Sequence, residues 1–252
     1  MPACDWFGGR PRTETNFGGS AGCLAGPALM PDELSRLHEI VHQRLIYNAR
    51  NLHGERAADL VADVPLAEYH TVCDRLNHSK MLTKTGRILR DSDIREIKQM
   101  SIFDEFRRAF GSVRLSDEDN IGFEQICMRV ARPQRTEDVG FLHCDSWFWR
   151  HHEWPLPEGL NRTKVWIGLD VQPELNGLVL CPRSHLKNYD FKVSNLGYKI
   201  KFDPDFDTSE LTYETFPGRS GQAVVFNYGT LHVGKLNQAA QSRTSIEFTL
   251  LY

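Results

Sequence analysis

Three side chains in the second half of this sequence have the types and order that bind a redox-active metal. His143 and Asp145 stand two residues apart in FLHCDSWFWRHHEW, and His232 follows an apolar run near the end. An imidazole and a carboxylate from one segment, with a second imidazole from elsewhere, form the facial triad of non-heme Fe(II). We expect His143 and Asp145 on a strand, where residues i and i+2 share a face. With ten histidines present, the pair alone is weak and depends on its context.

A possible anion clamp follows the second histidine. Arg243 comes eleven residues after His232 and opens the final segment, RTSIEFTLLY. A buried guanidinium binds a carboxylate in a bidentate manner. Ser245, two residues further along the same expected strand, would share its face and offer a hydroxyl. The pattern is compatible with a dicarboxylate that reaches from the metal to Arg243, and a surface arginine on an edge strand is the competing interpretation of Arg243 taken alone.

In this order the motifs resemble those of the Fe(II)/2-oxoglutarate dioxygenases, and more narrowly the phytanoyl-CoA dioxygenase-like branch. The stretch GLVLCPRSH at 177–185 matches that branch's Gly-Leu-x-x-x-Pro-Gly-Ser-His, with Arg183 in place of the second glycine. The stretch RSGQAVVF at 219–226 is a looser match to its Pro-Gly-Asp-x-x-x-Phe approach to the distal histidine. The resemblance covers roughly residues 120–252.

The resemblance implies a fold, cofactors and roles. The fold would be a double-stranded β-helix, a cupin-like jelly roll, with an N-terminal helical portion packed on one sheet. Fe(II) would be held by the triad, 2-oxoglutarate by Arg243 and Ser245, and O2 would be the oxidant, with release of succinate and CO2. Trp166 and Met128 match family residues beside the cosubstrate, although core packing is the competing interpretation for both. Gln125, on the expected strand of Met128, is a further candidate for a cosubstrate carboxylate.

The aromatic segment after the metal pair bears on the substrate. On a strand, Trp147 and Trp149 would share the face of Asp145, and indole rings stack on flat rings and cations. His151 and Glu153 form an alternative metal pair, which is disfavoured because it lies on a loop-like stretch. We expect His152 and Glu153 to contact the substrate instead. We expect a polar small molecule, a natural-product or sugar-containing compound. An acyl-CoA or other lipid is the alternative substrate. For the aromatic residues themselves, the alternative interpretation is that all of them are buried in the core.

The elements that must position these residues divide the chain into a helical part followed by a strand-rich part. Amphipathic spacing predicts helices over 31–52, 65–78 and 92–111. Short runs rich in β-branched and aromatic residues predict strands over 123–131, 163–171, 177–182, 211–216, 222–229 and 243–252. Long loops are expected at 133–138 and 188–207. We expect one dioxygenase domain over 1–252, with a lead-in at 1–30, a mostly helical part at 31–118 and a jelly-roll core at 119–252.

Composition narrows the functional class further. Hydrophobic residues make up 40% and charged residues 25% of the 252 residues, as in ordinary globular proteins. The net charge of −3 gives no basic excess for nucleic acid or an anionic membrane. Six scattered cysteines suggest reduced thiols in the cytoplasm. The oligomeric state stays open. Two other functional classes are also left open. One is a cupin-like isomerase or binding protein that does not use 2-oxoglutarate, which Arg243 disfavours. The other is a binding module without a metal, which the complete triad disfavours.

Overall fold

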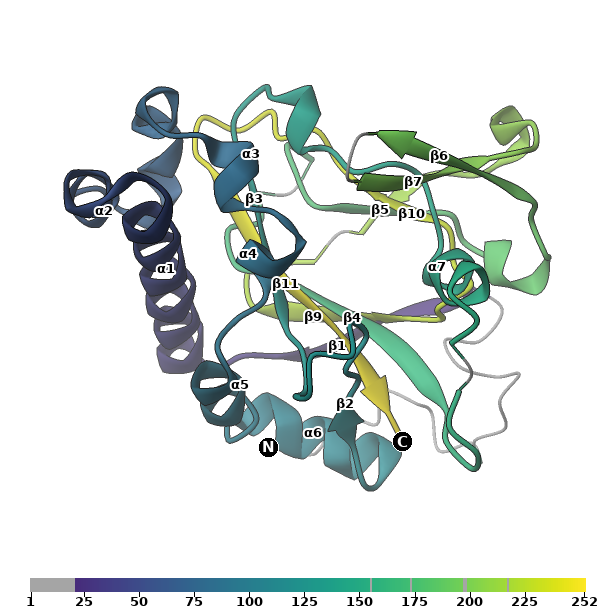
Figure 1. Cartoon of the computed structure of the whole chain (residues 1–252). Helices are drawn as coiled ribbons and strands as arrows, with labels where there is room; N and C mark the ends of the chain where they lie inside the picture. The colour runs from purple at the N-terminus through teal and green to yellow at the C-terminus, as the bar shows by residue number, and fades with distance from the viewer. Residues whose placement is uncertain (1–20, 155, 173, 197–198, 217) are drawn as a thin grey trace.

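The computed structural model describes residues 21–252, except residues 155, 173, 197–198 and 217. Figure 1 shows two parts around one large sheet. Helices from the first half of the chain cover one side of it, and a smaller sheet and a hairpin lie on the other. The expected class, mainly β with flanking helices, is confirmed.

The helices of the first half are more broken than the spacing predicts. Residues 65–78 form two 3-10 turns and the start of α3, and residues 92–111 form two helices. The interruption within 92–111 coincides with a helix cap. The Glu33 carboxylate accepts hydrogen bonds from the backbone N–H and hydroxyl of Ser101, the residue at which the second of the two helices begins. The helices are α1 (Pro31–His53), α2 (Glu55–Ala62), η3 (Leu66–Thr71), η4 (Cys73–Arg75), α3 (His78–Met81), α4 (Lys84–Arg87), α5 (Asp91–Ile97), α6 (Ser101–Phe110), η5 (Thr136–Asp138), α7 (Asp145–His151), η6 (Ser184–Leu186) and η7 (Thr208–Glu210).

The strands form two facing sheets and a hairpin. The large sheet has the order β1-β9-β4-β11-β2, with β3 also pairing with β11, and the small sheet has the order β10-β5-β8. Strands β6 and β7 pair with each other in a separate two-stranded sheet. The strands are β1 (Cys23–Ala28), β2 (Arg114–Leu115), β3 (Cys127–Ala131), β4 (Arg162–Gly168), β5 (Leu178–Leu180), β6 (Phe191–Leu196), β7 (Lys199–Pro204), β8 (Glu214–Thr215), β9 (Gln222–Phe226), β10 (His232–Gly234) and β11 (Arg243–Leu251).

Two of the expected irregular segments are in fact strands. Part of the 1–30 lead-in forms β1, which pairs antiparallel with β9 at the edge of the large sheet. Gly26 permits this contact, because a Cβ there would lie 2.9 Å from the Val225 side chain. The expected loop at 188–207 contains the β6-β7 hairpin. Residues 1–20 of the lead-in lie outside the described residues.

Strand β11 separates the two sides of the molecule. Its Ile246, Phe248 and Leu250 face the helices and join the main core with Leu37 and Leu45 of α1. The Phe248 ring stacks on Phe103 of α6, with centroids 5.6 Å apart. Successive residues on a strand alternate in direction, so Arg243, Ser245 and Glu247 face the interior between the sheets. The predicted apolar stripe of α1, namely Leu37, Ile40, Val41 and Leu45, is buried.

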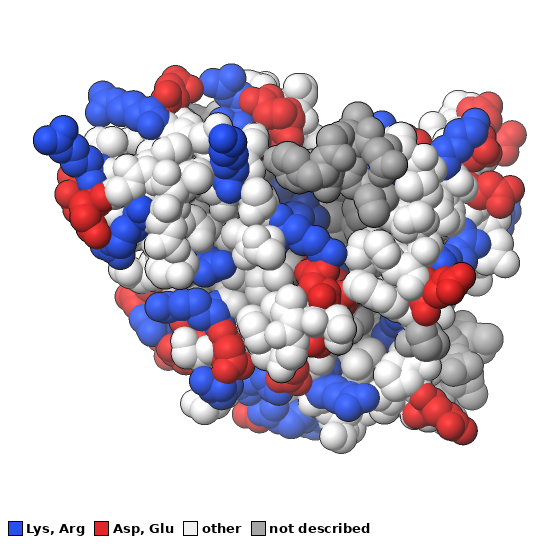
Figure 2. All heavy atoms as spheres, in the orientation of Figure 1, with Lys and Arg blue, Asp and Glu red and all other residues white. Residues whose placement is uncertain are grey.

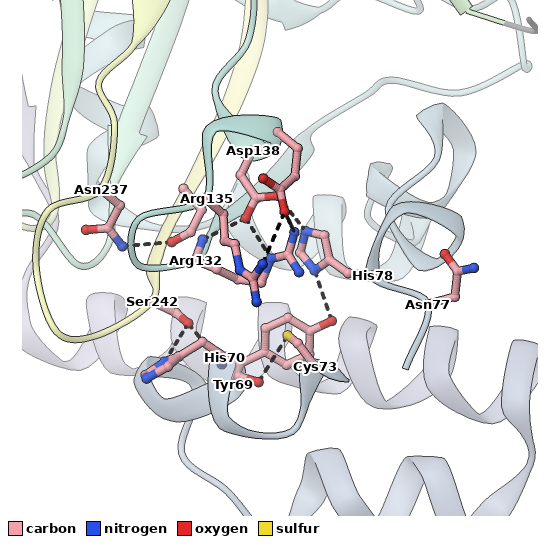
Figure 3. A network of polar contacts seen from close by, with 12 residues as sticks. Tyr69, His70, Cys73, Asn77, His78, Arg132, Arg135, Asp138, Asn237 and Ser242 are labelled. Carbon is pink, nitrogen blue, oxygen red and sulfur yellow. Dashed lines mark hydrogen bonds and ion pairs between the residues drawn. The ribbon is translucent and has the colours of Figure 1, made fainter. Parts of the chain in front are cut away.

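A polar network ties the helical part to the loops that flank β3 and β11 (Figure 3). Asp138 binds the Arg132 guanidinium through two bonds of 2.8 Å and lies 3.4 Å from the buried His78 ring. On its other side, the His78 ring contacts the Tyr69 hydroxyl at 3.2 Å. Ser242 reaches His70, and Asn237 donates to the Ala131 carbonyl. These contacts fix the chain just before Arg243.

The network predicts a pH dependence of stability. Burial lowers the pKa of His78 to about 4, whereas an exposed histidine titrates near 6.5. Because the folded-state pKa is depressed, the unfolded chain takes up a proton at His78 first. Stability therefore falls as the pH drops from about 6.5 to about 4, by at most about 3 kcal/mol. Urea unfolding of His78→Gln should show a flatter profile in this window. An equal flattening in the exposed control His53→Gln would contradict the assignment.

The surface is mixed in character. On the face shown in Figure 2, basic and acidic side chains of the described residues are interspersed. Among the described residues, Cys23, Cys73, Cys127, Cys144 and Cys181 are free thiols. None of the helices in this part of the chain has the length and apolar character needed to cross a membrane.

Candidate metal centre and cosubstrate pocket

The structure brings His143, Asp145 and His232 together. One ligand atom from each lies within 4.8 Å of the others. The two histidines are joined by an antiparallel bridge, in which each backbone N–H donates to the other's carbonyl, at 3.1 and 2.8 Å. This bridge adds the His143 segment to β10 of the small sheet. It sets the two rings 4.4 Å apart, centroid to centroid.

Asp145 reaches this cluster by a different route from the one expected. It is the first residue of α7 and does not lie on a strand with His143. The extended Cys144 precedes the helix, and the turn at its start aims the Asp145 carboxylate at His232, whose Nε2 is 3.9 Å from Asp145 Oδ2. The expected convergence of the pair therefore occurs, but strand alternation is the wrong reason for it.

The hydrogen bonds of the two imidazoles prepare them as ligands. His143 Nδ1 lies 2.6 Å from the Phe141 carbonyl, and His232 Nδ1 lies 3.0 Å from the Thr230 carbonyl. A carbonyl oxygen only accepts, so each Nδ1 carries the proton and each Nε2 keeps a free lone pair. Burial, together with the His232 ring, lowers the pKa of His143 to about 4. The ring is thus neutral near pH 7, as a metal ligand must be.

The carboxylate of Asp145 completes a donor set that suits a divalent cation. Its Oδ2 is buried, and no group in the described part of the chain donates a hydrogen bond to it, an arrangement that is costly unless another group satisfies it. Its Oδ1 lies 3.4 Å from the ammonium of Lys164. Two imidazole nitrogens and one carboxylate oxygen match the facial triad of non-heme iron. The residues present therefore fit Fe(II).

Arg243 and Ser245 form a second unsatisfied site inside the roll. Arg243 is only 3% exposed, and neither its Nε nor the buried Ser245 hydroxyl has a hydrogen-bond partner among the described residues. Burial, with the cation of Arg129, lowers the pKa of Arg243 to about 10. Trp166 lines the same space, with its ring centroid 5.8 Å from the Arg243 guanidinium carbon. A buried cation and hydroxyl on one strand face fit the far carboxylate of a dicarboxylic acid.

Sequence reasoning missed a group of charged residues on the interior strand faces. Half-buried Arg129 of β3 binds Glu247 of β11, with Arg129 Nε 2.9 Å from a carboxylate oxygen. Buried Lys164 of β4 lies near Asp145 and is 3.6 Å from Glu118. Burial alone would lower the pKa of Lys164, but the Asp145 and Glu118 carboxylates outweigh it and raise the pKa. A charged residue inside an otherwise apolar strand was the available signal.

Two predicted cosubstrate residues, Met128 from the resemblance and Gln125 from its expected strand, make structural contacts instead. Met128 is fully buried in the core between the large sheet and the helices, opposite Ile246. It is the alternate residues of β3, such as Arg129, that face inward with Ser245, so the pocket-lining role of Met128 was wrong. Gln125 precedes β3, and its amide donates to the Asp117 carboxylate at 2.9 Å. That contact gives Gln125 a structural role in the loop.

The aromatic segment is helical, so its side chains spread around α7. Trp147 is buried and stacks on Phe191 with centroids 5.3 Å apart, which contradicts its expected place at the pocket rim. His152 stacks on Trp154 at 5.0 Å. Trp149 and Glu153 do line a hollow beside the helix. The expected common face of Trp147 and Trp149 was therefore wrong, because helical residues two apart point in different directions.

Solved structures with this fold include several oxygenases. EctD from S. alaskensis, in a structure with 2-oxoglutarate and 5-hydroxyectoine, has a TM-score of 0.57 and 12% identity over 98% of this chain and 80% of its own. EvdO2 from Micromonospora carbonacea var. aurantiaca has a TM-score of 0.56 and 14% identity over 96% and 90%. The apo non-heme monooxygenase ThoJ has a TM-score of 0.52 and 12% identity over 95% and 78%. At these identities the likeness establishes a shared fold.

The jelly roll and its His-Asp-His cluster define the class of non-heme iron, 2-oxoglutarate-dependent oxygenases. Within it, the chain belongs to the phytanoyl-CoA dioxygenase (PhyH) family, whose model matches residues 26–245. It is therefore an Fe(II)/2-oxoglutarate-dependent dioxygenase, and its cofactors are Fe(II), 2-oxoglutarate and O2. No curated protein matches the chain.

The departure from the family motif at Arg183 has a structural consequence. Arg183 adopts φ 68°, the left-handed region that glycine tolerates and other residues adopt at a cost. We expect Arg183→Gly to stabilise the fold by about 1 kcal/mol and to raise the melting temperature by about 2–4 °C. Thermal unfolding measures this, with Lys187→Gly, at an exposed position of extended backbone, as the control. A lower melting temperature for Arg183→Gly would show that the arginine side chain stabilises the turn.

Proposed function

We propose that this dioxygenase oxidises a polar small molecule, with a natural-product or sugar-containing compound as the preferred class, and releases succinate and CO2. The observation that carries the proposal is the pairing of two unsatisfied sites inside one fold. Asp145 with the two histidines can hold a metal, and Arg243 with Ser245 can hold a carboxylate. A metal-only isomerase or binding protein gives no reason for the second site.

The proposed role of each residue follows from its contacts. His143, Asp145 and His232 would hold Fe(II), while Arg243 and Ser245 would hold the far carboxylate of 2-oxoglutarate. When bound, Fe(II) and 2-oxoglutarate supply the oxidising chemistry, which converts the cosubstrate to succinate and CO2. The backbone carbonyls of Phe141 and Thr230 keep the imidazoles in the ligand tautomer.

Trp166 would limit the space beside the cosubstrate. It lies in an apolar cluster with Leu178, Leu180 and Phe226, between the two sheets. Packing of this kind keeps water from the interior and holds the cosubstrate in one orientation. Lys164, through its contact with Asp145 Oδ1, would leave Oδ2 as the oxygen that faces the metal.

The surroundings of α7 bear on the nature of the substrate. Aromatic rings of Trp149 and Trp154 and the polar side chains of Arg150 and Glu153 line one hollow next to the metal-ligand segment. Rings suit a cyclic compound, and the charged groups suit its polar substituents. This combination favours a compact polar molecule over a long acyl chain.

Substrate-dependent succinate release tests the proposal. The iron-loaded protein is incubated with 2-oxoglutarate and O2, with sugar-containing and other cyclic polar metabolites in one panel and long-chain acyl-CoA esters in another. We expect a polar cyclic compound to raise succinate release above the level without substrate, and its mass to change accordingly. If only acyl-CoA esters do so, the substrate class is wrong. If no succinate forms under any condition, the reaction class is wrong.

A further inference from the structure

The hollow beside α7 has a volume of about 310 Å³ and is lined by both aromatic and charged side chains. Its walls carry Trp149, Trp154 and Tyr228, and its charged residues are Arg150, Glu153 and Arg162, the first residue of β4. The guanidinium carbon of Arg162 lies 4.0 Å from the centroid of the Trp149 ring and 5.5 Å from that of Tyr228. The guanidinium is thus stacked on one indole face and flanked by a second ring.

Stacking holds the Arg162 guanidinium without using its hydrogen-bond donors. A stacked guanidinium keeps its N–H groups in its own plane, directed outward. Arg162 Nε is buried without an acceptor, and among the described residues no carboxylate forms an ion pair with this side chain. Burial also lowers the pKa of Arg162. A buried donor that lacks a partner is costly, so the site is incomplete without an acceptor from outside the chain.

The hollow adjoins the metal-ligand segment. Ser146 lines it and directly follows Asp145, and the Ser146 backbone N–H donates to the Tyr228 carbonyl at 3.1 Å. Arg162 shares a strand face with Lys164, whose ammonium contacts Asp145. Two residues along a strand span about 7 Å. A small molecule that occupies the hollow is therefore close to the residues that would hold the iron.

We propose that Arg162, stacked on Trp149, binds an oxyanion of the substrate, a carboxylate or a phosphate, and that the substrate's ring lies against Trp154 and Tyr228. The inference rests on the proposed function and narrows its substrate to anionic ring compounds. The anion is distinct from 2-oxoglutarate, because Arg243 and Ser245 provide a separate carboxylate site on β11.

Binding of simple probes tests the anion site apart from catalysis. Titrations of the iron-loaded protein, with saturating 2-oxoglutarate and without O2, use benzoate, phenyl phosphate and uncharged benzamide, followed by tryptophan fluorescence and calorimetry. We expect benzoate or phenyl phosphate to bind about tenfold to a hundredfold more tightly than benzamide, as a charge-assisted hydrogen bond provides. The tighter of the two anions identifies the substituent. Equal affinity for all three probes would overturn the proposal.

Substitutions of Arg162 test whether this side chain binds the anion. Arg162→Gln should lose the preference for the anion and keep the affinity for benzamide, whereas Arg162→Lys should keep part of it. Arg56→Gln, at an exposed position of α2, is the matched control and should bind like the unchanged protein. If Arg162→Gln does not fold, protection of Arg162 from phenylglyoxal by benzoate, mapped by mass spectrometry on the unchanged chain, gives the same answer. An anion preference that survives Arg162→Gln, or a lack of protection, would refute the role.

Arg243→Ala separates this inference from the proposed function. It should keep the anion preference of the hollow, measured without 2-oxoglutarate, while it loses cosubstrate binding. If no succinate ever forms but the anion preference depends on Arg162, the proposed function fails and the binding site stands. If succinate forms with uncharged cyclic substrates as readily as with anionic ones, the inference fails and the proposed function stands.

Discussion

Asp145→Ala should reduce iron-dependent succinate release by at least about a hundredfold, while the chain stays folded. Loss of a residue that only orients a ligand costs 10- to 100-fold, and Asp145 would be a ligand itself. Asp145 is the acidic member of the cluster, and its Oδ2 accepts no hydrogen bond from the described residues. The variant leaves His143 and His232 joined by their backbone bridge, so the two imidazoles alone should bind iron weakly. Metal content after dialysis and succinate release measure the two effects.

Asp145→Asn and Asp74→Asn provide the controls. Asp145→Asn preserves volume and removes the charge, so it should also lose iron. Asp74 is highly exposed, at 87% of its side chain, and its replacement should change neither measurement. Thermal unfolding checks that Asp145→Ala remains folded, since Lys164 still has Glu118 within 3.6 Å. Full iron content and activity in a folded Asp145→Ala would rule out the metal site.

Arg243→Ala should raise the 2-oxoglutarate concentration needed for half-maximal succinate release by about two to three orders of magnitude and leave iron binding unchanged. Removal of one partner from a buried charge pair costs about 3–5 kcal/mol. Arg243 is almost fully buried, and in the described part of the chain its Nε has no partner. Its substitution therefore affects the cosubstrate more than the fold.

Two further variants of the clamp and one control make this result specific. Arg243→Lys keeps the charge but not the bidentate geometry, so its cosubstrate requirement should be intermediate. Ser245→Ala removes one hydroxyl and should raise the requirement by about tenfold. Arg114→Gln, exposed on β2, should behave as the unchanged protein. An unaltered 2-oxoglutarate requirement in folded Arg243→Ala would eliminate the clamp.

The periodicity and types of the residues were enough to predict which side chains come together in the site. They were not enough to predict the backbone conformation that brings them together. Alternation in RTSIEFTLLY placed Arg243 and Ser245 on one face, and the β11 pairings agree. The same reasoning was wrong for Asp145, Trp147 and Trp149. Aromatic residues fit helices as well as strands when tertiary packing decides, and Trp147 is fixed by its contact with Phe191.

The interior charges were the hardest part of the site to predict. Lys164 and Glu247 lie on strands that read as apolar, and only the sheet register shows that both face the space between the sheets. Met128 illustrates the same limit, because neighbouring residues on a strand point to opposite faces of the sheet. A shift of one residue therefore moves a side chain from the pocket to the core. Arg162 and Trp149 are 13 positions apart in the sequence, and their contact requires the turn between α7 and β4.

An anaerobic titration with Fe(II) and 2-oxoglutarate, followed by the charge-transfer absorption that the cosubstrate gives when it chelates iron, tests the central claim most directly. We expect one Fe(II) per unchanged chain and a saturable absorption that needs both components. The absorption should be absent in Asp145→Ala, and in Arg243→Ala it should need far more 2-oxoglutarate at an unchanged Fe(II) stoichiometry. The claim would be contradicted if the unchanged chain gave no such absorption, or if both variants titrated as it does.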